Sequence, residues 1–214
     1  MTVTKSREPL ESWLLYHLFK WSVVAPMLNF YFRGRIYGAE KVPQLGPFVA
    51  VSNHASDFDP PLLSSCMRRP VAFMAKEELF QVPILKQAIA LYGAYPVNRK
   101  APDRSALKSA LTYLESGWGT GVFLQGTRTP DGRITEPKLG AALIAAKAGV
   151  PLLPVCLWGT HAIMRKGSAM PKPVPVTVRI GDLIEPPSST NRQELEALTQ
   201  KCTAIINQMH DLGR

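Results

Sequence analysis

The stretch NHASDFDPP, residues 53–61, places one histidine and two aspartates directly after an apolar run of the chain. A histidine can serve as a general base, and a neighbouring carboxylate fixes its tautomer and stabilises its protonated form. Asp59 follows His54 by five residues, and Asp57 is a rival partner that spacing does not exclude. Asp59 before Pro60 is also typical of a helix N-cap, so the stretch indicates either a catalytic pair or a helix start beside a histidine.

Two arginines each follow an apolar, strand-like segment. Arg99 ends the stretch GAYPVNR, and Arg128 lies in FLQGTRTPDG, where a buried strand is expected to end in a glycine turn. A guanidinium group binds phosphate through two parallel hydrogen bonds, and Lys138 adds a positive charge further along. Each arginine alone is more typical of a solvated surface charge, but two at strand ends beside a His–Asp loop indicate a phosphate site.

Strand-like and helix-like segments alternate from residue 34 onward. This alternation predicts one α/β domain, residues 34–214, with a mostly parallel or mixed sheet flanked by helices. Reactive loops of such sheets gather at the carboxyl ends of strands, which is where His54 and both arginines fall. A last helix is expected to begin near Thr190, in the capping sequence TNRQ. The expected strands are 47–52, 71–75, 94–97, 121–124, 151–157 and 174–181, and the other expected helices are 105–115 and 138–148.

The N-terminal segment, residues 1–33, is apolar and aromatic between positions 10 and 32 and is flanked by lysines and arginines. Pro26 is expected to break or kink it, giving two short helices. Because Trp, Tyr and basic residues favour the membrane interface, one interpretation is a helical pair that lies on one leaflet. The alternative is a helical hairpin packed on the domain core. No stretch offers the roughly 20 uninterrupted apolar residues that a membrane span needs, and no cleavable signal peptide is evident.

Lysine and arginine number 25 against 16 acidic residues, a formal net charge of +9, which attracts polyanions such as nucleic acid, anionic lipid, phosphorylated substrates or an acidic carrier protein. No basic-plus-aromatic motif supports nucleic acid as the partner. The absence of G-x-S-x-G and of a glycine–lysine pair disfavours a serine hydrolase and a P-loop enzyme. The cysteines are far apart and form no C-x-x-C, which disfavours disulfides or a zinc site and favours a reducing cytosol; they are Cys66, Cys156 and Cys202.

Four blocks of the sequence together resemble the PlsC-like glycerolipid acyltransferases. NHASDFD matches that family's H-x-x-x-x-D signature, and PVNR is similar to its arginine block. QGTR stands where the family has E-G-T-R, and VPLLPV is similar to its final proline block. The four blocks occur in the family's order over roughly residues 35–160. The chain is therefore similar to the 1-acylglycerol-3-phosphate (lysophosphatidic acid) acyltransferases.

The resemblance implies a role for each matched residue. His54 would be the general base that removes a proton from the acceptor hydroxyl. Asp59 would orient and charge-stabilise it, which decides the rivalry against Asp57. The residues expected to bind the acceptor or shape its site are Arg99, Gln125, Gly126, Thr127, Arg128 and Lys138.

The resemblance also implies the reaction and its setting. A fatty acyl group would pass from acyl carrier protein or a coenzyme A thioester to the free hydroxyl of a lysophospholipid, favouring 1-acylglycerol-3-phosphate and giving phosphatidic acid. The chemistry needs no metal and no cofactor. The protein would act at the cytoplasmic face of a membrane as a peripheral or monotopic protein, held by its N-terminal helix pair, with no nucleic acid as partner.

Gln125 departs from the family pattern, which usually has glutamate. A carboxylate only accepts hydrogen bonds, whereas an amide donates and accepts. Either the acceptor is a lysolipid other than lysophosphatidate, or this lineage tolerates the exchange. A non-catalytic, membrane-bound lipid-binding relative is the further alternative.

Overall fold

A seven-stranded sheet forms the centre of the computed structural model, which describes residues 8–81, 86, 89, 93–97, 104–164 and 170–214. The strand order is β1-β7-β6-β2-β5-β3-β4. Neighbouring strands are parallel except for the antiparallel pair β6 and β7, so the predicted mostly parallel, mixed sheet is confirmed. The strands are β1 Arg35–Tyr37, β2 Phe48–Ser52, β3 Val71–Lys76, β4 Ala94–Val97, β5 Gly119–Phe123, β6 Leu152–Trp158 and β7 Thr177–Ile180.

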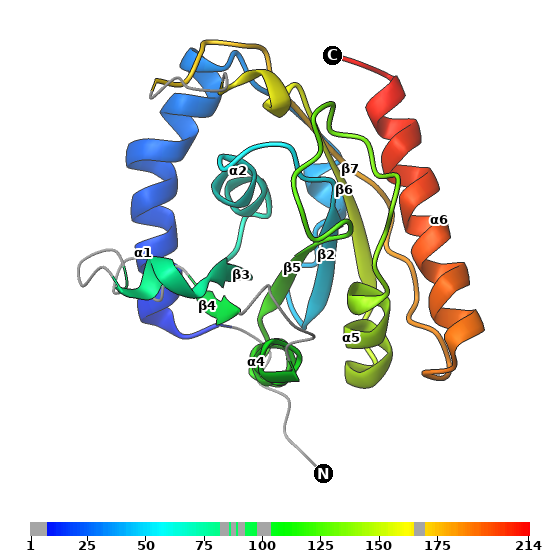
Figure 1. The fold of residues 1–214 in the computed structure, drawn as a ribbon. Helices are drawn as coiled ribbons and strands as arrows, with labels where there is room; N and C mark the ends of the chain where they lie inside the picture. The colour runs from blue at the N-terminus through cyan, green and yellow to red at the C-terminus, as the bar shows by residue number, and fades with distance from the viewer. Residues whose placement is uncertain (1–7, 82–85, 87–88, 90–92, 98–103, 165–169) are drawn as a thin grey trace.

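Helices cover both faces of the sheet, which explains why its central strand is buried along its whole length. Figure 1 shows α1 and α2 on one side of the sheet and α5 and α6 on the other. Successive side chains of β2 alternate between two cores: Val49 and Val51 face one, and Phe48 and Ala50 face the other. The helices are α1 Leu10–Phe19, α2 Asp59–Cys66, α4 Arg104–Glu115, α5 Gly140–Ala148 and α6 Arg192–Asp211.

The expected strands and helices are all present, with shifts of a few residues at their ends. Strand β1 is present in addition and was not predicted from the sequence. The start of α6 needs a correction. Asn191, not Thr190, is the N-cap, and its side chain accepts the backbone N–H of Glu194 at 2.9 Å. The carboxylate of Glu194 in turn accepts from the Asn191 side chain and the Ser189 backbone. Asparagine and a glutamate three residues on form the stronger capping box, which moves the helix start by one residue.

The N-terminal segment is one continuous helical run over residues 10–31, so the expected break at Pro26 is wrong. α1 continues into two π-helical stretches, Lys20–Val24 and Met27–Tyr31, on either side of the proline. The N–H of Ala25 donates to the carbonyl of Lys20, five residues earlier. In an α-helix a proline ring clashes with the carbonyl four residues before it, and the wider π-helical turns relieve that clash.

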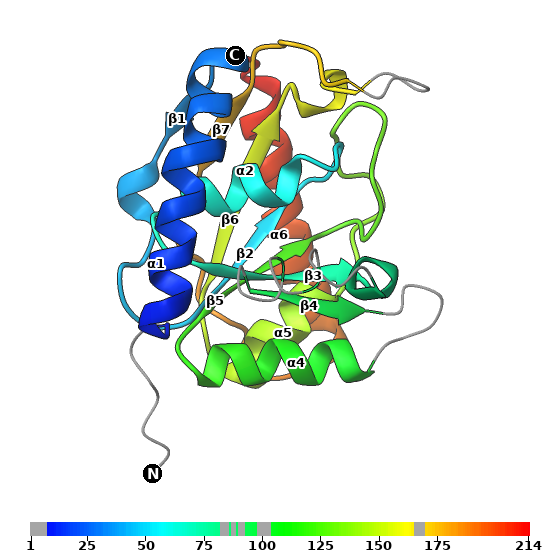
Figure 2. The same ribbon diagram turned by 90° about the vertical axis from the view of Figure 1, so that its left-hand side faces the viewer.

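One face of this N-terminal helix packs on the domain and the other faces outward (Figure 2). Tyr16, Val24, Leu28 and Phe32 are 2% exposed or less, and the last three belong to the core on the α2 side of the sheet. The Tyr16 hydroxyl donates to the carbonyl of Ser64 in α2 at 2.7 Å. The helix is therefore packed on the core along one face and leaves large apolar side chains exposed along the other.

The start of the helix is tied to the domain by a buried ion pair. Arg69 is 2% exposed and Glu8 is 6% exposed, and the guanidinium of Arg69 donates to the carboxylate of Glu8. The same guanidinium lies over the ring of Phe48, and it donates to the backbone carbonyls of Pro43, Gly46 and Gly117. One arginine thus joins the start of the N-terminal helix to the two loops that precede β2 and β5, at the amino-terminal end of the sheet.

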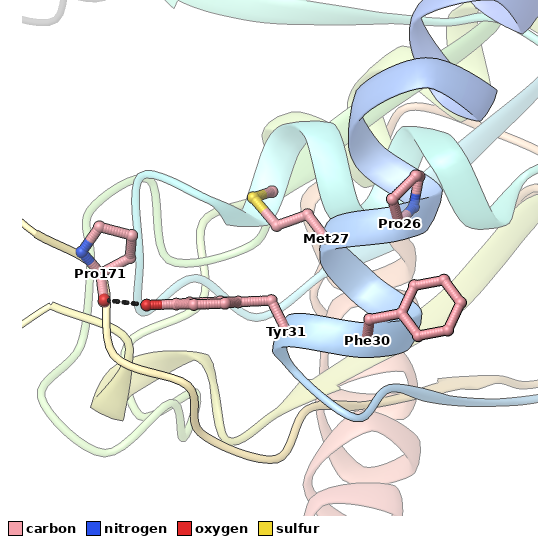
Figure 3. A pocket seen from close by; sticks show the side chains of 5 residues that line it. All are labelled: Pro26, Met27, Phe30, Tyr31 and Pro171. Atoms are coloured by element: carbon pink, nitrogen blue, oxygen red, sulfur yellow. Dashed lines mark hydrogen bonds between the residues drawn. The ribbon is translucent and has the colours of Figure 1, made fainter.

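An open apolar cavity of about 580 Å³ lies at the far end of the N-terminal helix. Figure 3 shows the Tyr31 hydroxyl pointing to the carbonyl of Pro171, to which it donates at 2.7 Å. The lining residues are Pro26, Met27, Phe30, Tyr31 and Pro171. Among the helices that the structure describes, none is both long enough and apolar enough to cross a membrane.

Candidate active site

His54 and Asp59 face each other in the loop after β2. Nδ1 of His54 lies 2.8 Å from Oδ2 of Asp59, and the two residues are 6% and 0% exposed. The same oxygen accepts the backbone N–H groups of Ala55 at 2.6 Å and Ser56 at 2.7 Å. An ionised carboxylate only accepts hydrogen bonds, so Nδ1 of His54 carries the proton that it donates to Asp59, and this tautomer leaves the lone pair on Nε2.

The expected N-cap role of Asp59 is wrong. α2 begins at Asp59 itself, Phe58 occupies the cap position, and no side chain caps the helix. The carboxylate turns back to the loop because His54 and two backbone N–H groups converge on it there. The double proline, Pro60 and Pro61, falls in the first turn of the helix, where backbone N–H groups have no intrahelical partner, so the prolines lose no hydrogen bond.

Asp57, the rival partner, points elsewhere. Its carboxylate forms an ion pair with the guanidinium of Arg128, and the two side chains are 75% and 48% exposed. His54 is instead bracketed by Asp59 and by the ring of Phe123, on which its imidazole stacks with ring centroids 4.1 Å apart and an interplanar angle of 16°. The geometry thus selects Asp59 as the carboxylate that orients the imidazole.

The loop between β5 and α5 brings the QGTR block beside the histidine. The N–H of Lys138 donates to the carbonyl of Leu124 at 2.7 Å and closes the base of the loop. Gly126 adopts φ +75°, a conformation that favours glycine, and its N–H donates to the carbonyl of Phe123. Further along, the N–H and hydroxyl of Thr129 both donate to the carbonyl of His54, at 2.8 and 3.2 Å.

Most of the expected site residues are therefore gathered near one another. Thr127, Arg128 and Lys138 are exposed on this loop. Gln125 is half-buried, and its Oε1 accepts backbone N–H groups of the same loop. Arg99 lies outside the described residues.

Asn53, the residue before the histidine, was not predicted from the sequence to belong to the site. Its Nδ2 donates to the carbonyls of Gly132 at 2.7 Å and Leu157 at 2.9 Å, and its Oδ1 accepts the N–H of Leu157 at 2.8 Å and the hydroxyl of Ser52 at 3.4 Å. Asn53 is 1% exposed, so a polar side chain with four hydrogen bonds is buried between β2, β6 and the loop of Arg128. An asparagine that directly follows a strand expected to be buried was the available signal.

The described part of the chain has three free cysteines, all of them buried. Within that part, no group of three or more His, Cys, Asp or Glu side chains is placed to hold a metal ion. Burial raises the pKa of Cys66 and of Cys156 to about 12 and that of Cys202 to about 11, which keeps these buried thiols protonated.

The chain is similar to several known proteins. Residues 33–158 match the family model described as Acyltransferase. A chloroplastic 1-acyl-sn-glycerol-3-phosphate acyltransferase of Brassica napus is 36% identical over 141 residues, which are 64% of this chain and 41% of that protein. A 1-acyl-sn-glycerol-3-phosphate acyltransferase of Bacillus subtilis is 28% identical over 183 residues, 83% of this chain and 90% of that one.

A solved structure is similar as well. The 1-acyl-sn-glycerophosphate (LPA) acyltransferase PlsC from Thermotoga maritima has a TM-score of 0.70 at 29% identity, covering 90% of this chain and 82% of that one. The matched part is about two fifths of the Brassica napus protein, while it is most of the two bacterial proteins. Since the family model spans more than half of the sequence, the chain belongs to the acyltransferase family.

Proposed function

We propose that the protein moves a fatty acyl group from a thioester to the free hydroxyl of a lysophospholipid. The acceptor is 1-acylglycerol-3-phosphate and the product is phosphatidic acid. The observation that carries the proposal is the buried His54–Asp59 pair directly beside the loop of Arg128, because it places a base next to a binding group for phosphate. The named activities of the Brassica napus, Bacillus subtilis and Thermotoga maritima relatives support it.

In this reaction His54 is the general base. Nε2 removes the proton of the acceptor hydroxyl while its oxygen attacks the thioester carbonyl, so that a C–O bond forms and the C–S bond breaks. The departing thiolate takes up the proton from the imidazolium. Asp59 stabilises that imidazolium, and base catalysis of this kind contributes about 10²–10⁴-fold in rate.

Arg128 holds the acceptor's phosphate, with Lys138 adding charge and with Gly126 and Thr127 shaping the turn. Arg128 is paired with Asp57 in the structure, but both side chains are substantially exposed. An exposed ion pair is worth only about 0–1 kcal/mol, whereas charge-assisted hydrogen bonds to a phosphate are worth roughly 1.5–3 kcal/mol each. A phosphate therefore displaces Asp57. Arg99 is proposed as the second arginine of this site.

The N-terminal segment, residues 1–33, attaches the protein to the cytoplasmic face of a membrane as a peripheral or monotopic protein. Leu10, Leu14, Leu18 and Trp21 recur every three or four residues, and each is more than half exposed. They form one apolar stripe along the exposed side of the helix, a pattern typical of helices that lie in the interface plane.

The donor is an acyl carrier protein or acyl coenzyme A, both of which suit the net charge of +9. A panel assay tests the whole proposal. Purified protein receives one labelled acyl thioester of each type with a set of lysolipids, and the products are separated by mass. We expect lysophosphatidate to be acylated. A folded protein that acylates none of the lysolipids with either donor would refute the assignment as an enzyme.

The catalytic assignment and the membrane assignment each have a variant. His54→Ala should abolish transfer with the fold intact, since the residue lies in a loop; near-native turnover would show that another group is the base. Leu14→Ser with Leu18→Ser should weaken co-sedimentation with anionic vesicles by about tenfold or more, because two leucine side chains no longer insert into the membrane interface. Leu212→Ser is the matched control, since Leu212 is an equally exposed leucine at the end of α6.

A further inference from the structure

The loop between β5 and α5, residues 124–139, is called the Arg128 loop. A short piece of its backbone, residues 132–136, is held by three carboxamide side chains that lie far apart in the sequence. The first is Asn207 of α6. Its Oδ1 accepts the N–H of Ile134 at 3.1 Å, and its Nδ2 donates to the carbonyl of the same residue at 2.9 Å. The carboxamide thus pairs with Ile134 as a neighbouring peptide group would in a sheet. Figure 1 shows the segment between β5 and α5 lying beside the C-terminal half of α6.

The second carboxamide is Gln125, which follows the end of β5. Its Oε1 accepts the N–H of Thr135 at 3.0 Å and that of Glu136 at 3.5 Å. Within the described part of the chain, its Nε2 has no hydrogen-bond partner. Only the carbonyl half of the Gln125 side chain therefore contributes to holding the loop.

The third carboxamide is Asn53, at the end of β2. Its Nδ2 donates to the carbonyl of Gly132 at 2.7 Å. Two further hydrogen bonds, one from Nδ2 and one to Oδ1, join Asn53 to the backbone of Leu157 in β6. Asn53 immediately precedes His54, so one residue links the backbone of the catalytic histidine to the loop.

These contacts replace what regular secondary structure would supply. Residues 132–136 form neither helix nor strand, so their backbone groups lack ladder partners and need others. A carboxamide can donate and accept without adding a charge. Thr129, which lies next to Arg128, donates to the carbonyl of His54, so the position of this loop sets the distance from the phosphate site to the base.

We propose that Asn53, Gln125 and Asn207 are positioning residues that hold Arg128 where a bound phosphate brings the acceptor hydroxyl to His54. The inference rests on the proposed function. Gln125 acts through its carbonyl oxygen, which a glutamate carboxylate also provides, so a glutamine can stand where the resembling family has glutamate without a change of acceptor. Misplacement of reacting groups by about 1 Å can cost on the order of 10²-fold in rate, so these distant hydrogen bonds matter for the reaction.

The kinetic test uses Asn207→Ala, a change on α6 that removes both bonds to Ile134. We expect kcat/KM for lysophosphatidate to fall by about tenfold or more, with the KM for the acyl donor unchanged. Gln208→Ala is the matched control, because Gln208 is the next residue of the helix and is exposed. Equal losses on the donor and acceptor sides, or wild-type kinetics for Asn207→Ala, would overturn the proposal.

The second test reads the loop without using activity. Amide hydrogen exchange is measured in a peptide covering residues 132–139 of the intact protein. Gln125→Leu should speed exchange by about two- to tenfold, since it removes the acceptor of two N–H groups. Gln125→Glu should exchange as the wild type does, because it keeps that acceptor. Faster exchange in both variants, or in neither, contradicts the role assigned to the carbonyl oxygen.

The two proposals fail in different ways. If the wild type acylates none of the lysolipids while exchange responds as expected, the proposed function is wrong and the loop architecture stands. If the wild type acylates lysophosphatidate but neither Asn207→Ala nor Gln125→Leu has its expected effect, the positioning role is wrong and the acyltransferase proposal stands.

Discussion

Removing the Asp59 side chain separates its two roles, since the same oxygen both orients His54 and holds the loop. Asp59→Ala leaves three donors without their acceptor: Nδ1 of His54 and the backbone N–H groups of Ala55 and Ser56. His54 and Ser56 are buried, so two of these donors are left unpaired in the interior. Each unpaired buried donor costs about 1–3 kcal/mol.

The expected net loss for Asp59→Ala is at the low end of that sum, about 2 kcal/mol, because removing a buried carboxylate also removes the cost of its own desolvation. For a domain of this size, 1 kcal/mol shifts the Tm by about 2–4 °C, so the variant should melt about 4–8 °C lower. Asp59→Asn keeps a carbonyl oxygen for the three donors. Its amide nitrogen takes the buried position of Oδ1, where no described residue offers a hydrogen-bond partner. The Asn variant should lose less stability, about 1 kcal/mol.

Turnover should fall steeply in both variants, since a neutral or absent partner no longer stabilises the imidazolium. The corresponding swap in a Ser-His-Asp triad lowers turnover by about 10⁴-fold. Urea denaturation and the acyl-transfer assay measure the two effects separately. Asp57→Asn is the control, and should keep both stability and turnover because Asp57 is exposed and, among the described residues, pairs with Arg128 alone. An Asp59→Ala variant as stable as the wild type, or a collapse of turnover in Asp57→Asn alone, would refute the assignment.

Three further predictions follow from other contacts. Arg69→Met should cost roughly 3–5 kcal/mol in urea unfolding because it leaves the Glu8 carboxylate buried and unpaired; a loss below about 1 kcal/mol would contradict this. Arg128→Ala should raise the acceptor KM about ten- to a hundredfold with little change on the donor side; impaired donor kinetics alone would mean that Arg128 binds the donor's phosphate. Burial, reinforced by the charge of Arg133, lowers the pKa of His210 below its usual 6.5. As the pH falls, His210 is therefore protonated in the unfolded chain before it is protonated in the folded one, and the stability of the fold decreases below about pH 6.5. The Tm should therefore drop less in His210→Gln than in the wild type between about pH 7.5 and 5.5, and equal drops would exclude His210 as the cause.

The sequence by itself determined the elements whose signal is local. Residues 48–51 are all apolar because β2 is covered on both faces, and that pattern is visible without coordinates. Parallel strands also place their carboxyl ends at one edge, so the neighbourhood of His54 and Arg128 followed from strand order along the chain. The α/β class and most element boundaries were predictable for the same reason.

Only the tertiary structure decided which groups pair across long sequence separations. Spacing alone left Asp57 and Asp59 as rival partners of His54. In the folded chain Asp57 pairs with Arg128 from the loop after β5. Asp59 instead accepts three hydrogen bonds from the histidine loop, one of them from His54. The continuous N-terminal helix depended on packing of Val24 and Leu28 against the core, which holds the run together through a proline.

The carboxamides that hold the Arg128 loop were hidden from the sequence for a related reason. Asn53 and Gln125 lie in two loops and Asn207 lies in α6. Asn207 is more than 70 residues from Ile134, the residue whose backbone it bonds. A hydrogen bond between a side chain and a distant peptide group leaves no periodicity or spacing pattern in the sequence. Every residue has a backbone carbonyl, so only the fold decides which one a given carboxamide meets.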